Sequence, residues 1–387
     1  MQVKQIYQIT NDIARELLGE EAVVQEDLSN VVELGQQFET VAGLDNYVRA
    51  LNDHIGRMIF VDRVYSGRAP SVYMDGWEYG SIMEKVSAQL PQATENETWE
   101  LENGKSYDQD VFYKPSVSVS FWNNRVTFEI PVSLTEKQVK SAFSSVTQLN
   151  AFISMIYTAI SNAMTIRLDA LIMRTINNMA GETIAADYAE ADLSSKSGVR
   201  AVNLLYLYNN RAGAPTTDLT ADEAITDPGF IRFASLTMRN YADYMSVMST
   251  RFNVAGQERH TPADRLHWVT LSAFLNAADV YLQSDTFHED YTRLPNAEAV
   301  PFWQGSGEDF AFSSTGSIDI KTASGKDVKA SGVLAVMFDT YALGVTNIDR
   351  RVTTHYNAKA EFWNEWHKYD AGYFNDLGEN FVVFFVA

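Results

Sequence analysis

The chain has 387 residues, of which 46% are apolar, enough for a folded protein with a sizeable core. It carries 50 acidic against 30 basic side chains, a formal net charge of −20, which argues against tight nucleic-acid binding because neutralising phosphates requires clustered cations. The absence of cysteine excludes a disulfide scaffold, a thiolate metal site and a cysteine nucleophile.

The N-terminal segment carries the first periodic pattern. Ile6, Ile9, Ile13 and Leu17 recur at helical spacing, which predicts an amphipathic helix. The segment lacks the apolar core of a secretory signal peptide, so we expect synthesis in a cytoplasm.

Residues 61–115 differ from the preceding segment in composition and in periodicity. Glycines and aromatic side chains are scattered through this stretch, its middle is acidic, and no apolar period is sustained. A loop of about 50 residues is too long for a compact domain unless it serves a purpose outside that domain. We predict an arm that docks on another molecule.

Two runs of alternating residues follow the loop, at 117–121 and 126–132. Apolar side chains occupy every second position in both runs, which is typical of half-buried β-strands. Asn123 and Asn124 lie between the runs and suit a two-residue hairpin turn with positive φ. The sequence therefore predicts a β-hairpin here.

A long helix is predicted next, opened by Ser133 and Glu136, which fit a capping box. No charged residue occurs in 141–166, a length that would suit a membrane span. Small polar residues nevertheless recur every three or four positions, which predicts a buried amphipathic helix with a polar stripe instead. That helix continues toward Gly181, and its stripe consists of Asn150, Ser154, Thr158, Ser161 and Thr165.

Residues 187–332 have the pattern of an inserted α/β domain. Asp227 and Pro228 form an N-cap and N1 pair that opens a helix. The further predicted elements are a strand at 267–272, a helix at 273–283, a hairpin at 317–331 and a return to β pattern at 332–345.

The chain closes on the apolar run FVVFFVA, residues 381–387. The run is too short to span a membrane, which takes roughly 20 apolar residues. A half-buried strand would alternate apolar and polar residues, and this run does not. We therefore predict a central strand covered on both faces.

One cluster of side chains resembles a metal site. Glu361, Glu365 and His367 would share one face of a strand, but no second histidine lies at ligand spacing, and a solvated strand face explains the same residues. Seven tryptophans could line a sugar cleft or a protein interface. In a chain with 50 acidic residues, a pair of carboxylates is not evidence for a glycosidase site. The sequence shows no set of residues with the pattern of a catalytic site.

The order of these elements resembles that of tailed-bacteriophage major capsid proteins with the Hong Kong 97 fold, most closely the phi-29-type branch. Residues 28–38 and 47–66 are similar to the N-terminal arm, and the loop before Pro115 is similar to the extended loop. The remaining matches are residues 141–178 with the spine helix, 266–282 with the axial domain, and 332–345 with the return into the peripheral domain.

The resemblance implies an α+β fold with four parts. These are an N-terminal arm at 1–60, an extended loop at 61–115, a peripheral domain with the spine helix at 116–186 and 333–387, and an inserted axial domain at 187–332. The terminal run would then be a strand of the peripheral sheet. Assembly contacts are expected in the extended loop, at Arg68, Tyr73, Trp77, Glu84, Lys85 and Trp99.

The implied function is structural, not enzymatic: a virion subunit that self-assembles into pentamers and hexamers of an icosahedral head in the host cytoplasm. Its expected partners are copies of itself, a separate scaffolding protein, a portal protein and, loosely, the packaged DNA. No cofactor, metal or membrane is expected, and neither is a fused immunoglobulin-like domain. The alternatives are an encapsulin-like compartment, which shares the fold but loads protein cargo, and a carbohydrate-active enzyme.

Overall fold

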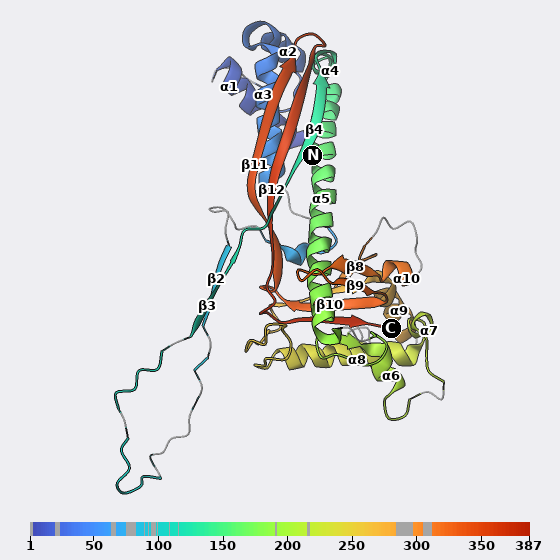
Figure 1. Cartoon of the computed structure of the whole chain (residues 1–387). Coiled ribbons are helices and arrows are strands. Elements are labelled where there is room, and N and C mark those ends of the chain that lie inside the picture. The colour runs from blue at the N-terminus through green and yellow to red at the C-terminus, as the bar shows by residue number, and fades with distance from the viewer. Residues whose placement is uncertain are drawn as a thin grey trace.

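The computed structural model describes residues 3–19, 24–62, 67–74, 83–88, 90–91, 93, 98, 100–107, 109–114, 116–189, 192–214, 217–283, 297–304 and 312–387. One helix, α5 (Val146–Tyr188), runs along the long axis of the molecule. At one end α5 packs with a four-stranded sheet and the N-terminal helices, and at the other end with a five-stranded sheet (Figure 1). Both helices and strands therefore build the molecule, as the α+β prediction requires.

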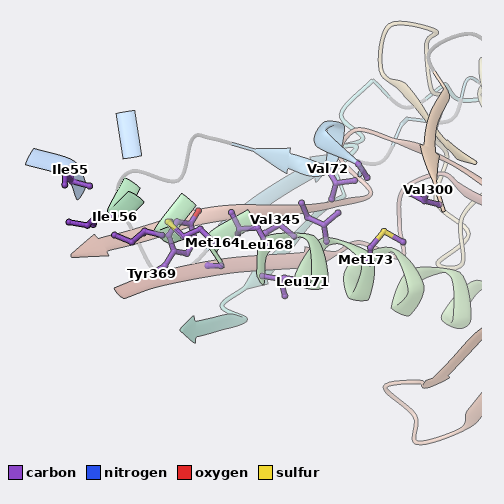
Figure 2. Close-up of a cluster of buried hydrophobic side chains, with 14 of the residues drawn as sticks. Ile55, Val72, Ile156, Met164, Leu168, Leu171, Met173, Val300, Val345 and Tyr369 are labelled. Carbon is purple, nitrogen blue, oxygen red and sulfur yellow. The ribbon is translucent and has the colours of Figure 1, made fainter. Parts of the chain in front are cut away.

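The length of α5 follows from its sequence. Ser145 caps it by accepting a hydrogen bond from the Gln148 amide at 3.3 Å, and 43 helical residues at 1.5 Å each give about 65 Å. Figure 2 shows Met164 and Leu168 of α5 in a buried cluster with Val345 and Tyr369. The helix is long and apolar enough to meet the length and composition of a membrane span, but its apolar face packs inside the protein.

The four-stranded sheet, here the peripheral sheet, has the order β1-β11-β12-β4. Burial alternates along its long strands, so one face packs on helices while the other is more accessible to solvent. Only β1 runs parallel to its neighbour. The strands are β1 (Tyr73–Met74), β4 (Arg125–Thr135), β11 (Leu343–Asn357) and β12 (Phe362–Asn375).

The N-terminal segment, expected to form the N-terminal arm, is a unit of helices. Ile6, Ile9 and Ile13 are buried, as their helical spacing predicts, and α3 contacts β11, β12 and α5. The apolar stripe of α1 packs on α3 and α5, and that of α3 packs on the peripheral sheet, while the assignment of residues 1–60 to an N-terminal arm stays a prediction. The unit comprises α1 (Val3–Leu18), α2 (Val31–Gln37), the π-helix η1 (Phe38–Ala42) and α3 (Leu44–Asp62).

The five-stranded sheet, here the axial sheet, has the order β5-β13-β10-β6-β7. Its faces pack into two separate cores: Val382 and Phe384 of β13 face a core with α8, while Val383 and Phe385 face a core with α5. This confirms the prediction of a last strand buried on both faces. The strands are β5 (Ala201–Asn203), β6 (Leu266–Leu271), β7 (Ala297–Val300), β10 (Val333–Asp339) and β13 (Phe381–Phe385).

The sheet to which the last strand belongs differs from the expectation. β13 pairs with β10 and β5, so the axial sheet combines strands from both sides of the expected boundary between residues 332 and 333. Only β11 and β12 of the segment 333–387 join β4 in the peripheral sheet. The expected grouping was wrong for β10 and β13 because their unbroken apolar runs need cover on both faces, which the one-sided peripheral sheet does not provide.

Helices and a hairpin flank the axial sheet. The helix predicted at Asp227-Pro228 is confirmed, with the Asp227 side chain accepting from the Phe230 amide at 2.6 Å. The predicted strand, helix and hairpin after it are also present. The flanking elements are α6 (Leu204–Asn209), α7 (Ala221–Ala224), α8 (Pro228–Met245), α9 (Ser272–Gln283), α10 (Phe312–Thr315), β8 (Ile318–Lys321) and β9 (Asp327–Ala330).

The hairpin predicted around Asn123 and Asn124 does not form. β3 (Val117–Trp122) pairs with β2 (Met83–Ala88), and the next strand, β4, pairs with β12. Neither asparagine has positive φ, so the chain passes from β3 into β4 without turning back. The prediction was wrong because two alternating runs joined by two residues look the same whether they pair with each other or with distant strands.

The helix start also differs. β4 extends to Thr135, and the capping box that opens α4 (Glu136–Ala142) is made by Thr135 and Gln138 instead of Ser133 and Glu136. A short break then separates α4 from α5, whose cap is Ser145. Two overlapping cap motifs occur in this stretch, and the pairing of β4 with β12 decides between them.

Candidate assembly interface

The extended loop leaves the body of the molecule through the ribbon of β2 and β3 (Figure 1). The described residues between 90 and 116 are all exposed. Phe112 is 84% exposed and Tyr113 is 83% exposed. Further exposed apolar side chains on the loop and ribbon are Val86, Leu90, Leu101, Val111, Val117, Val119 and Phe121. Such a concentration of exposed apolar surface is typical of an interaction site.

The N-terminal stem of the loop is held by two carboxylates. The Arg68 amide donates to Asp169 of α5 at 3.2 Å, and the Arg68 guanidinium lies 4.8 Å from the centre of the Phe302 ring. Ser71 donates from its amide and hydroxyl to the Glu298 carboxylate at 3.0 and 2.8 Å. Burial raises the pKa of Glu298, and the bonds from Ser71 oppose that rise. The stem is thus tied to both α5 and the axial sheet.

The stem continues into β1, which adds to the edge of the peripheral sheet. Tyr73 lies opposite Val345, and its hydroxyl is 3.0 Å from the Tyr369 hydroxyl. Arg350 donates to the Tyr73 hydroxyl at 3.4 Å. These contacts place Tyr73 within its own subunit.

The outgoing strand of the ribbon, β2, is held by a charged cluster. Lys85 Nζ lies 2.6 Å from Asp376 Oδ2 and 2.6 Å from Glu379 Oε1. Arg259 Nε donates to the same Glu379 oxygen at 2.9 Å. All four side chains are less than one-fifth exposed, so these ion pairs are screened less than surface pairs. The cluster fixes where the ribbon leaves the body.

The residues predicted as assembly contacts therefore divide into three groups. Arg68, Tyr73 and Lys85 contact their own subunit at the base of the loop. Glu84 is exposed on β2. Trp77 and Trp99 lie outside the described residues.

Sequence reasoning missed the partners that hold the loop. Asp169, Glu298, Asp376 and Glu379 lie between 101 and 294 positions from the loop residues that they bind. In a chain with 50 acidic residues, no local spacing distinguishes these four. Their role follows only from the strand pairing that brings β11, β12 and the axial sheet to the base of the loop.

The suspected metal cluster is a different kind of site. Glu365 and His367 are buried on the inner face of β12, with exposures of 0% and 1%, whereas Glu361 is exposed in the preceding turn. The interpretation as a solvated strand face is therefore wrong. In the described part of the chain, no three His, Asp or Glu side chains converge as metal ligands. Burial raises the pKa of Glu365 to about 8 and lowers that of His367 to about 4, so both are neutral near pH 6.

Comparison with solved structures finds similar chains. One, in the structure of head fiber and inner core protein gp22 of native bacteriophage P68, has a TM-score of 0.50 at 10% identity and covers 84% of this chain and 86% of its own. A chain from the capsid of Staphylococcus phage Andhra has a TM-score of 0.48 at 10% identity, covering 82% and 83%. One from the capsid of cyanophage P-SCSP1u has 0.45 at 10% identity, covering 82% and 86%.

Sequence comparison gives the family. No curated protein sequence matches this chain. The family model described as Phi29-like phage major capsid protein matches residues 10–385, nearly the whole chain. The long α5, the two sheets and the projecting loop agree with the capsid fold that the element order predicted. The chain therefore belongs to the Phi29-like phage major capsid proteins.

Proposed function

We propose that this capsid protein builds the pentamers and hexamers of an icosahedral head by laying its extended loop across a neighbouring subunit. The observation that carries the proposal is the contrast between the base of the loop and its outer part. The base is fixed by Arg68, Ser71, Tyr73 and Lys85, while the outer part exposes Phe112 and Tyr113. Burying two such aromatic side chains on a partner contributes about 1.5–3 kcal/mol each.

The six loop residues named from the sequence take two roles in this proposal. Arg68, Tyr73 and Lys85 set the direction of the loop through contacts within the subunit. We assign Glu84, Trp77 and Trp99 to contacts with the neighbour. A fixed base lowers the entropy that the loop loses on docking, which favours one geometry of association.

The other partners follow from the family and from charge. A separate scaffolding protein and a portal protein would direct assembly in the host cytoplasm, and the shell would enclose DNA. The net charge of −20 suits this role because an acidic shell repels packed DNA instead of gripping it. An encapsulin-like compartment would load protein cargo instead. The nucleic-acid content of particles purified from infected cells separates these two functions.

The loop is tested by replacing residues 90–114 with a short glycine-serine turn that keeps β2, β3 and the Lys85 cluster. The variant subunit should stay soluble and melt cooperatively, because the described residues removed contribute nothing to either core. It should form no shells when expressed with the other head proteins, as seen by electron microscopy.

A finer variant and its control complete the test. Phe112→Ser with Tyr113→Ser should reduce shell yield at least tenfold without changing the melting temperature. Glu102→Gln, a change at another exposed position of the same loop, should assemble like the wild type. Normal particles from the shortened loop would refute the proposed contact.

A further inference from the structure

A polar patch lies inside the interface between the peripheral sheet and the N-terminal helical unit. Alternate residues of β12 point to the same inner face, and among them Glu365 and His367 are fully buried. Asn52 of α3, also 0% exposed, faces this patch. The surrounding interface is apolar, which makes these three side chains an exception within it.

The three side chains lack hydrogen bonds. Both oxygens of Glu365, both ring nitrogens of His367 and both amide atoms of Asn52 are buried without a partner among the described residues. Asn52 lies near enough to favour the charged form of Glu365 somewhat, but the two do not reach hydrogen-bonding geometry. Each such group destabilises the closed interface, a cost that contact with water would remove.

No described charged group pairs with Glu365 or His367. On α3, Asp45 accepts from the Trp363 indole at 2.9 Å and pairs with Arg49, while His54 contacts Glu16 of α1. On β11, Arg350 lies beside Tyr73 and Tyr369. Tyr356 donates to Glu136, the first residue of α4. The inner positions of β4 between 126 and 134 are apolar, and α5 has no charged residue before Arg167. A charge on Glu365 or His367 would therefore be buried without compensation.

The rest of the helical unit is anchored elsewhere. Phe38, Tyr47 and Phe143 form an aromatic cluster with ring centres 4.8 to 5.8 Å apart, which joins the unit to the end of α4. Apolar side chains of α1 and α3 extend this contact. The unit is thus held at the α4 end by aromatic packing, whereas the buried polar atoms of Asn52, Glu365 and His367 make no hydrogen bond across the patch.

We propose that the contact of α3 with β12 is a pH-sensitive latch, closed while Glu365 and His367 are both neutral and opened when either becomes charged. Opening moves the part of α3 around Asn52 away from the sheet and gives the charged side chain access to water, while the aromatic cluster, which includes Tyr47 at the start of α3, keeps the unit attached. The latch is a property of the single subunit and does not depend on how the loop docks.

The pKa shifts of Glu365 and His367 determine how opening of the latch depends on pH. Burial raises the pKa of Glu365 from 4.5 to about 8, so its contribution to closure is complete below pH 4.5 and is lost as the pH rises through 8. Burial lowers the pKa of His367 from 6.5 to about 4, so its contribution is complete above pH 6.5 and is lost as the pH falls through 4. The contributions of Glu365 and His367 cancel between about pH 4.5 and 6.5. Above that range, the equilibrium constant for opening increases roughly tenfold per pH unit up to about pH 8.

Amide hydrogen exchange of the full-length subunit tests the latch. Protection factors for peptides covering residues 44–56, corrected for the intrinsic effect of pH on exchange, should fall on the order of 20-fold from pH 6 to pH 9. Glu365→Gln, which keeps the shape and cannot ionise, should abolish the fall. Glu129→Gln, on the exposed face of the same sheet, should keep it.

A second variant, Asn52→Leu, tests the latch independently in case Glu365→Gln does not fold. Asn52→Leu removes the amide that favours the charged form of Glu365, so the midpoint of the fall should move to higher pH. Equal wild-type protection at pH 6 and pH 9 would overturn the latch, and so would an undiminished fall in Glu365→Gln. An unmoved midpoint in Asn52→Leu would overturn the role of Asn52 beside the carboxyl group.

Discussion

The two sheets of this capsid protein bury their strands in different ways. Every residue of β10 and β13 in the axial sheet is buried, because helices cover both faces. Burial alternates along most of β11 and β12 in the peripheral sheet, and the inner face includes buried polar residues. The axial sheet is thus buried on both faces and forms part of the hydrophobic core, whereas the peripheral sheet packs against helices on one face only. We expect the axial sheet to contribute most of the free energy of unfolding, and the contacts of the peripheral sheet to change more readily.

The largest effect should come from removing the last strand. Deleting residues 381–387 removes six large apolar side chains, and burial at about 1.5–3 kcal/mol each gives roughly 9–18 kcal/mol as an upper bound. This matches the whole stability of a typical domain, about 5–15 kcal/mol. The truncated chain should be insoluble or lack a cooperative melting transition in circular dichroism. A soluble, cooperatively melting truncation would contradict the axial sheet as the folding core.

A matched pair of substitutions compares the sheets directly. Phe384→Ala empties a fully buried site between β13 and α8 and should cost about 3–5 kcal/mol. Phe128→Ala removes a half-buried ring of β4 that stacks on Tyr369 at 5.1 Å, and should cost less than half as much. Urea unfolding of both variants measures the difference. Equal losses would show that the two sheets contribute alike.

Local patterns in the sequence predicted the axial elements well. The terminal run, the helix opened by Asp227 and Pro228, and the hairpin at 317–331 all have signals within a few residues, and all are present. Each signal is local because the apolar run or the cap needs no knowledge of its partner. The long helix was predicted for the same reason.

Pairing between distant segments could not be predicted. The runs on either side of Asn123-Asn124 look like a hairpin, yet their partners are β2 and β12. The carboxylates that hold Lys85 lie more than 290 positions away. Buried Glu365 and His367 look like a solvated strand face because α3, which covers them, is distant in sequence. The register of a strand and the elements that pack over it depend on tertiary contacts, which a short stretch of sequence does not contain.

Backbone geometry at the end of the axial sheet gives a third, smaller effect. Gly332 has φ of +69°, and a Cβ at this position would overlap the Val386 carbonyl oxygen. Gly332→Ala should therefore cost about 2–4 kcal/mol, the sum of left-handed strain and a backbone clash. Gly325→Ala in the β8–β9 turn has φ of +84° with open space around it, so it should show the strain alone, about 1–2 kcal/mol. Equal melting temperatures for the two variants would exclude the clash with Val386.

The smallest effect tests the end of the peripheral sheet, where the sequence offered two caps. The Thr135 hydroxyl accepts from the Gln138 amide at 3.3 Å, and the Gln138 side chain accepts from the Thr135 amide at 2.9 Å. Thr135→Ala should cost about 1 kcal/mol, because the Gln138 amide at the start of α4 loses its acceptor. Ser133 instead donates to Asn364 on the exposed surface, so Ser133→Ala should change the free energy of unfolding by less than about 0.5 kcal/mol. If Ser133→Ala were the costlier change, α4 would begin at the earlier cap and β4 would end two residues sooner, which would shorten its pairing with β12.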